Sequence, residues 1–139
     1  MIICVIDGQG GKLGSIIVAK LKERLKEKVE IIALGTNSIA TQAMMKARAN
    51  KGASGENAIV RTVRKADIVI GTLNILMANS MLGEFTPRMA EAIVECDAMK
   101  YTLPVTQNNV AVVGLKELSI PQMVDLLAEE VERAVRCAK

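Results

Sequence analysis

The stretch from Asp7 to Gly14, with the sequence Asp-Gly-Gln-Gly-Gly-Lys-Leu-Gly, holds the residues of this chain best suited to bind a ligand. An apolar run over residues 2–6 precedes it, and helical spacing begins near Lys12. A strand, a glycine turn and a helix in this order offer backbone N–H groups and the positive end of a helix dipole to a phosphate. The sequence therefore predicts a phosphate-binding corner that uses Asp7, Gly8, Gln9, Gly10, Gly11, Lys12 and Gly14.

Two further apolar runs end in small polar residues, over residues 35–38 and 71–74. In a parallel sheet these ends and the glycine turn meet at one edge, where ligands of such sheets bind. The positions that we expect to contact a ligand there are Gly35, Thr36, Asn37, Gly71, Thr72 and Asn74. Asn37 and Thr72 are the predicted contacts to a sugar or base. The alternative is a purely structural set of turns, because tight strand-to-helix turns need glycine in any case.

The glycine turn departs from the dinucleotide fingerprint G-x-G-x-x-G, because its third glycine comes one position late, at Gly14. The second apolar run also lacks the terminal acid that bonds a ribose hydroxyl, and Glu30 is at its other end. Both departures disfavour NAD in the standard pose. NADP or another phosphate-bearing nucleotide is still compatible with the sequence. The groups that could contact its 2′-phosphate are Thr36, Asn37, Ser38, Arg48 and Lys51. For the two basic residues, Arg48 and Lys51, the alternative is ordinary surface charge.

The chain contains no histidine, which excludes Ser-His-Asp and Cys-His catalysis and His-based zinc sites. Asp7 and Glu84 are the candidate acid–base residues, followed by Glu56 and Asp67. For Asp7 the alternative is an Asx-type contact with the glycine amides. We predict no metal site. Lys12 opposes the helix dipole unless an anion is bound nearby, although a solvated lysine is the simpler interpretation.

A methionine-rich stretch, with Met77, Met81 and Met89, indicates core or a subunit interface, and it supports the expectation of a homo-oligomer. We expect Asn79 and Ser80 either to line the pocket or to cap a turn.

Half of the 139 residues are hydrophobic, with no Trp and with one Phe and one Tyr, so we expect a single domain with an aliphatic core.

The composition also limits the partners. The net charge of +3 is spread along the chain with no basic run among aromatics, so we expect no nucleic-acid partner. No apolar run approaches the roughly 20 residues that span a bilayer, and Met1 leads directly into the first strand without room for a signal peptide. The cysteines, Cys4, Cys96 and Cys137, are odd in number and far apart, which predicts reduced thiols and a cytoplasmic location.

Apolar runs predict strands over residues 2–6, 30–34, 68–70, 101–105 and 110–113, and residues 51–55 are predicted as a loop. The short link over residues 106–109 predicts that the last two strands form an antiparallel hairpin at the edge of the sheet. Helical spacing follows Lys12, Ile39 and Thr86, a short helix is expected to begin from Ser54 or Asn57, and Ser119 is predicted to cap the last helix. Residues 75–85 are compatible with a buried helical turn.

Several of these stretches together resemble a known family: residues 5–11, 32–37, 52–58 and 78–84. They are similar to those of a bacterial family catalogued as domain of unknown function 3842, and the resemblance covers almost the whole chain. It implies a Rossmann-like fold and no established activity, so it assigns no catalytic residue.

We therefore predict one α/β domain over residues 1–139, a three-layer Rossmann-like fold. Its sheet has about five mostly parallel strands with an antiparallel edge hairpin. The predicted function is binding of a nucleotide or dinucleotide through the Gly8–Gly14 loop. The alternatives are a non-catalytic ligand-sensing or partner-binding module, and a small enzyme acting on a phosphorylated metabolite.

Overall fold

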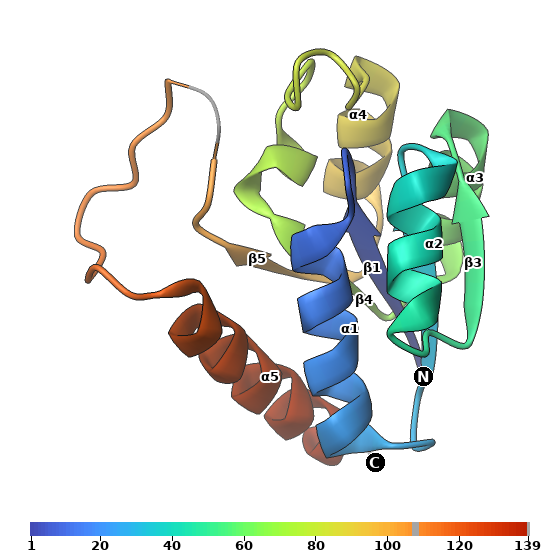
Figure 1. Cartoon of the computed structure of the whole chain (residues 1–139), viewed down its shortest axis with the longest axis vertical. Coiled ribbons are helices and arrows are strands. Elements are labelled where there is room, and N and C mark those ends of the chain that lie inside the picture. The colour runs from blue at the N-terminus through green and yellow to red at the C-terminus, as the bar shows by residue number, and fades with distance from the viewer. Residues whose placement is uncertain (107–108, 139) are drawn as a thin grey trace.

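The computed structural model describes residues 1–106 and 109–138. Five parallel strands form one sheet in the order β3-β2-β1-β4-β5, between two layers of helices (Figure 1). This is the strand order of a doubly wound, Rossmann-like sheet. The strands are β1 (Ile2–Asp7), β2 (Glu30–Gly35), β3 (Lys51–Ser54), β4 (Ile68–Thr72) and β5 (Met99–Leu103). The helices are α1 (Lys12–Leu25), α2 (Ser38–Lys46), α3 (Glu56–Thr62), α4 (Pro87–Glu95) and α5 (Ile120–Cys137), with short 3₁₀ turns at Val63–Lys65 and Leu73–Leu76.

Alternate residues of β1 pack on opposite faces of the sheet. Ile3 and Val5 join the core beneath α1, α2 and α5, whereas Cys4 and Ile6 join the core beneath α3 and α4. A strand buried on both faces needs an unbroken apolar run, and the sequence of β1 has one. The half-buried Tyr101 of β5 packs against the first of these cores.

Local sequence explains where the helices begin. Gly11 adopts a left-handed conformation, with φ of 71°, immediately before α1. The hydroxyl groups of Thr86 and Ser119 accept hydrogen bonds from the first turns of α4 and α5, and both helices have proline in that turn, as the sequence predicted.

Two strand predictions are wrong. The structure has no antiparallel edge hairpin in its described part: β5 pairs in parallel with β4, and residues 110–113 form no strand. Residues 51–54, predicted as loop, form the edge strand β3. The predicted link over residues 106–109 lies partly outside the described residues.

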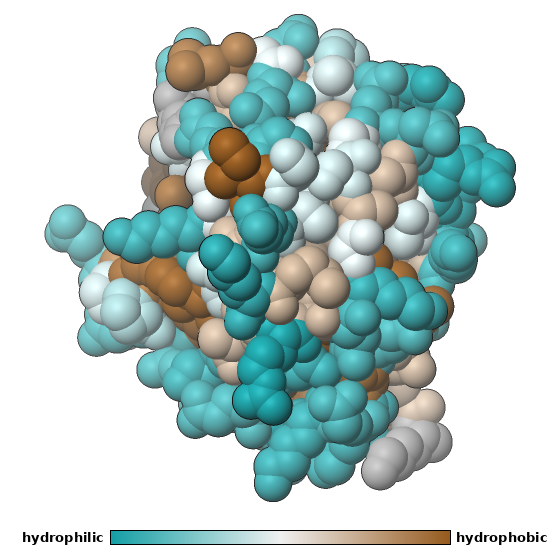
Figure 2. Space-filling view, turned by 45° about the vertical axis from the view of Figure 1, so that its right-hand side comes forward, coloured by the Kyte–Doolittle hydropathy of each residue, from teal (hydrophilic) through white to brown (hydrophobic). Residues whose placement is uncertain are grey.

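The described helices include none that is long and apolar enough to cross a membrane. The three cysteines are free, and burial raises the pKa of the Cys4 thiol to about 12. On the side of the molecule shown in Figure 2, the surface is mostly hydrophilic and the exposed hydrophobic residues form small separate patches.

Candidate functional site

The glycine turn and the ends of β2 and β4 meet at the carboxyl edge of the sheet, as the sequence predicted. This follows from the parallel pairing of β1 with β2 on one side and with β4 on the other. The edge therefore divides into two parts, one next to β2 and one next to β4. These two parts have different hydrogen bonding.

Asp7 holds the two ends of the glycine turn together. Its Oδ1 accepts a hydrogen bond from the amide of Gly8 at 2.8 Å, and its Oδ2 accepts one from the amide of Gly14 at 2.7 Å. Burial raises the pKa of the Asp7 carboxyl group, the two amides act in the opposite direction, and the charge of Glu84 raises it further. Both oxygens of this carboxylate are thus engaged with the backbone of the turn.

Glu84 comes from the segment between β4 and α4 and reaches across to the end of β2. Its Oε1 accepts hydrogen bonds from the amide of Gln9 at 2.7 Å, from Nδ2 of Asn37 at 2.9 Å and from the Thr36 hydroxyl group. Burial raises the pKa of Glu84, but these three hydrogen bonds outweigh that effect and leave the pKa below its ordinary value. A carboxylate therefore does lie at the end of β2, although β2 itself does not supply it.

Residues 77–85 cover this β2 part of the edge. A Cβ atom added to Gly8 would lie 2.5 Å from Sδ of Met81 and 2.8 Å from Oε1 of Glu84, so the covering segment touches the turn directly. Met81 and Leu82 both have positive φ, which is uncommon for residues with side chains. We call this part, formed by Thr36, Asn37 and Glu84 with Gly8, the closed side.

The part next to β4 holds an open pocket of about 190 Å³. Among the residues that the structure describes, none accepts a hydrogen bond from the amides of Gly10, Lys12 or Leu13. A Cβ atom added to Gly10 would meet nothing within 4 Å. We call this part, formed by Gly10, Lys12 and Leu13 with Thr72 and Asn74, the open side.

Asn74 borders the pocket and is only 4% exposed. Its Oδ1 is buried without a hydrogen-bond donor among the described residues. Its backbone, in contrast, is fixed: the amide donates to Oγ1 of Thr72 at 3.3 Å and the carbonyl accepts from the Ser80 hydroxyl group at 2.6 Å. A buried polar atom without a partner costs about 1–3 kcal/mol, so its presence here calls for an explanation.

The other predicted ligand contacts have structural surroundings. Gly11 donates its amide to the carbonyl of Gly8 at 2.9 Å. The remaining three glycines face packed side chains where a Cβ would stand, within 2.9 Å in each case. These are Gly14 beside Met44, Gly35 beside Thr41, and Gly71 beside Ile75.

Several other candidates lie away from the open side. Arg48 follows the far end of α2, and Lys51 begins β3 and pairs with Glu30 at 3.4 Å, so both are at the opposite edge of the sheet. Asp67 accepts from the amide of Ile2 at that same edge. The Glu56 carboxylate accepts a hydrogen bond from the Thr86 hydroxyl group at 2.6 Å.

The methionine-rich stretch is mostly core, since Met81 and Met89 are buried and Met77 is half-buried. Ser80 is fully buried, whereas Asn79 is exposed. The pocket is also lined by Leu13 and Val105, which were not among the predicted ligand contacts, and by Met81, which the sequence assigned to core or a subunit interface. Within the described part of the chain, no three His, Cys, Asp or Glu side chains group closely enough to hold a metal ion.

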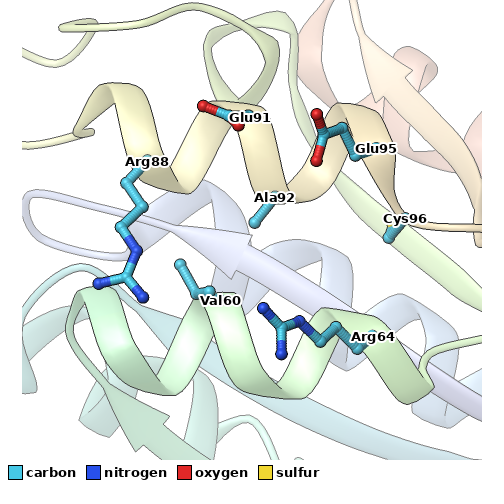
Figure 3. A pocket seen from close by; sticks show the side chains of 7 residues that line it. All are labelled: Val60, Arg64, Arg88, Glu91, Ala92, Glu95 and Cys96. Atoms are coloured by element: carbon cyan, nitrogen blue, oxygen red, sulfur yellow. The ribbon is translucent and has the colours of Figure 1, made fainter.

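A second opening of about 480 Å³ lies between α3 and α4 (Figure 3). Arg64 and Arg88 line it together with Glu91 and Glu95, so it has no single charge to match a ligand. Arg88 points towards the start of α3, where it pairs with Glu56 at 3.8 Å. None of its charged side chains is buried, and the open side of the glycine turn is therefore the better candidate site.

Comparisons with known proteins give a family and a likeness to solved structures. The family model described as Domain of unknown function (DUF3842) matches residues 2–136. No curated protein matches the chain. One similar solved structure is that of a dodecameric FMN-dependent UbiX-like decarboxylase from Escherichia coli O157:H7, with 12% identity and a TM-score of 0.46 over 96% of this chain and 92% of that one. A likeness at this level indicates neither a shared ligand nor a shared activity.

Proposed function

The chain belongs to the DUF3842 family, and we propose that it binds a small phosphate-bearing molecule in the pocket on the open side of the glycine turn. One observation carries this proposal. The amides of Gly10, Lys12 and Leu13 have no acceptor among the described residues, and the same pocket is bordered by the unpartnered Asn74 side chain. Free amides at a helix N-terminus favour an anion, and Asn74 can bond a hydroxyl or amide group beside it.

The size of the pocket limits the ligand. At about 190 Å³ it is smaller than the roughly 300–1,000 Å³ typical of pockets for drug-sized molecules. A dinucleotide extends over both sides of such a turn, but Glu84 and the segment over Gly8 occupy the β2 side here. We therefore favour a mononucleotide phosphate or a phosphorylated metabolite over NAD or NADP.

The contacts of Asp7 favour binding over acid–base catalysis. A general base needs a free lone pair within reach of the substrate proton. Each Asp7 oxygen accepts a backbone hydrogen bond, from Gly8 or from Gly14, which uses two of the roughly four lone-pair sites of the carboxylate and fixes its orientation towards the turn. We accordingly propose a binding role for this turn, with Lys12 as the side-chain cation nearest to the bound phosphate.

The proposal is tested by titrating ¹⁵N-labelled protein with inorganic phosphate, AMP and NAD and by recording amide chemical shifts. We expect phosphate and AMP to shift the amide resonances of Gly10, Lys12 and Leu13 in a saturable way. NAD is expected to bind more weakly than AMP, because its second half would meet the closed side. Unchanged resonances of these three amides with all three compounds would contradict the proposal.

Variants locate the site. Gly10→Val projects a side chain into the pocket without meeting protein atoms at its Cβ, so we expect binding to be lost while the fold is retained. Lys12→Ala is expected to weaken phosphate binding by about tenfold. Lys46→Ala is the matched control, because Lys46 is an exposed lysine in the last turn of α2. Equal affinity in Gly10→Val and in the wild-type protein would place the ligand elsewhere.

A further inference from the structure

The segment over residues 109–118, which we call the arm, connects β5 to α5 without regular secondary structure. It runs beside the domain rather than over it (Figure 1). Residues 110–113, which we call the tip, are Val-Ala-Val-Val and are all exposed, and Val113 is 95% exposed. Soluble domains rarely leave a contiguous apolar run in water unless the run meets a partner.

The arm makes no hydrogen bond to the rest of the domain in the part of the chain that the structure describes. Its turn at Val113 and Gly114 is local to the arm. Nothing within the domain therefore fixes the arm through polar contacts. Its backbone groups and its apolar side chains are both available to another surface.

An apolar pocket of about 370 Å³ lies at the other end of the arm, and we call it the arm pocket. Leu103 and Pro104 form one wall, and Met123 and the half-exposed Leu126 of α5 form another. Leu115 and Leu118 of the arm complete it, with Lys116 and Glu117 beside them. The tip of the same chain does not enter this pocket, since its four residues are exposed.

We propose that the chain self-associates by exchanging arms, so that the tip of each copy inserts into the arm pocket of a second copy. The chain carries both halves of the contact, an uncovered apolar tip and an uncovered apolar pocket, and a twofold arrangement covers both halves in both copies. The tip has no charge, and Lys116 and Glu117 beside the pocket cancel, so nothing here selects a charged partner. This inference is independent of the proposed phosphate binding.

Sedimentation velocity on the full chain at micromolar concentrations tests the exchange. We expect the wild-type protein to self-associate. Val113→Asp and Leu126→Asp should each lower the association constant by about a hundredfold or more, because each buries an unpaired carboxylate in the contact. Val94→Asp is the matched control, since Val94 is a 56%-exposed valine on α4, away from the arm. Circular dichroism confirms that each variant is folded.

Mixing the two arm variants separates arm exchange from other kinds of association. A Val113→Asp chain keeps an intact arm pocket and a Leu126→Asp chain keeps an intact tip, so their mixture retains one of the two contacts of a dimer. We expect the mixture to associate more strongly than either variant alone. A monomeric wild-type protein, an association unaffected by Val113→Asp, or a mixture no stronger than its components would each overturn the proposal.

Discussion

The two sides of the glycine turn differ in whether their polar groups have hydrogen-bond partners among the described residues. On the closed side, the Glu84 carboxylate takes the Gln9 amide and the polar groups at the end of β2. On the open side, the amide of Gly10 and the buried side chain of Asn74 have no partner among the described residues. The hydrogen bonds of the closed side stabilise the fold. On the open side, the unpaired polar groups cost free energy, and a ligand that bonds them removes that cost.

The comparison predicts that a single methyl group has very different effects on the two sides. In Gly8→Ala, the new Cβ would lie 2.5 Å from Sδ of Met81 and 2.8 Å from Oε1 of Glu84, so we expect a loss of about 2–3 kcal/mol in the free energy of unfolding. Gly10→Ala meets nothing within 4 Å and should change that free energy little. Urea denaturation of the two variants measures the difference. Equal destabilisation would remove the distinction between a packed side and an open one.

Glu84→Ala is expected to have the next largest effect, because it leaves the Gln9 amide and the Asn37 side chain without their carboxylate. We expect the free energy of unfolding to fall by about 1–2 kcal/mol, a loss that is limited because the site is partly exposed to water. Glu91→Ala is the control, since Glu91 is an exposed glutamate of α4 with no ion pair in the described part of the chain. A Glu84→Ala protein as stable as this control would mean that the closed side is held by packing alone.

The effect of Glu84 should depend on pH. Its pKa is lowered in the folded state, so its ionised form stabilises the fold above the unfolded value of about 4.3. That contribution is lost as the pH falls through the folded pKa, and the gap between wild type and Glu84→Ala should narrow there. Asp7 affects stability in the opposite direction. Its pKa is raised in the folded state, so its ionisation lowers the free energy of unfolding as the pH rises. Denaturation midpoints at neutral and acidic pH measure the gap, and a constant gap would contradict the stabilising role of the Glu84 charge.

The smallest effect is expected on the open side. Asn74→Leu removes a buried oxygen that has no hydrogen-bond donor among the described residues and keeps a similar side-chain shape. We therefore expect the free energy of unfolding to rise by about 1 kcal/mol or to stay unchanged. Ser80→Ala is the control with the opposite sign, since the Ser80 hydroxyl group donates a hydrogen bond that is then lost. Stabilisation by inorganic phosphate should persist in Asn74→Leu, because the amides of Gly10, Lys12 and Leu13 are unchanged, whereas the additional stabilisation by AMP over phosphate should shrink. A clear loss of stability in this variant would show that Asn74 serves the fold and not a ligand.

The central strands and the glycine turn were predictable because their signals are local. The apolar run before Asp7 and the helical spacing after Lys12 are adjacent in the chain, and the caps at Thr86 and Ser119 act within one helical turn. Parallel pairing then brings the strand ends together without further information. The location of the candidate site followed from these facts alone.

The two edges of the sheet were not predictable in this way. Residues 51–54, Lys-Gly-Ala-Ser, have weak strand propensity and become a strand because β2 offers them a hydrogen-bonding edge. The β-branched tip has high strand propensity but forms no strand. Strand formation depends on an available partner as much as on local sequence.

The closed side depends on contacts between distant parts of the chain. Glu84 is 48 residues from Thr36 and 75 from Gln9 in sequence. No local pattern reports such a contact, although Glu84 was among the residues singled out by their chemistry. A search for an acid within β2 could not have found it, because another segment supplies the carboxylate.

The aromatic composition makes the molecule convenient to study by optical spectroscopy. Tyr101 is the single tyrosine of a chain that has no tryptophan, and it lies half-buried in β5, a few residues before the arm. Its intrinsic fluorescence therefore comes from one place, with no background from other emitters of that kind. Quenching or polarisation of this emission would follow events at that edge of the sheet in real time, in the native protein and without an attached dye.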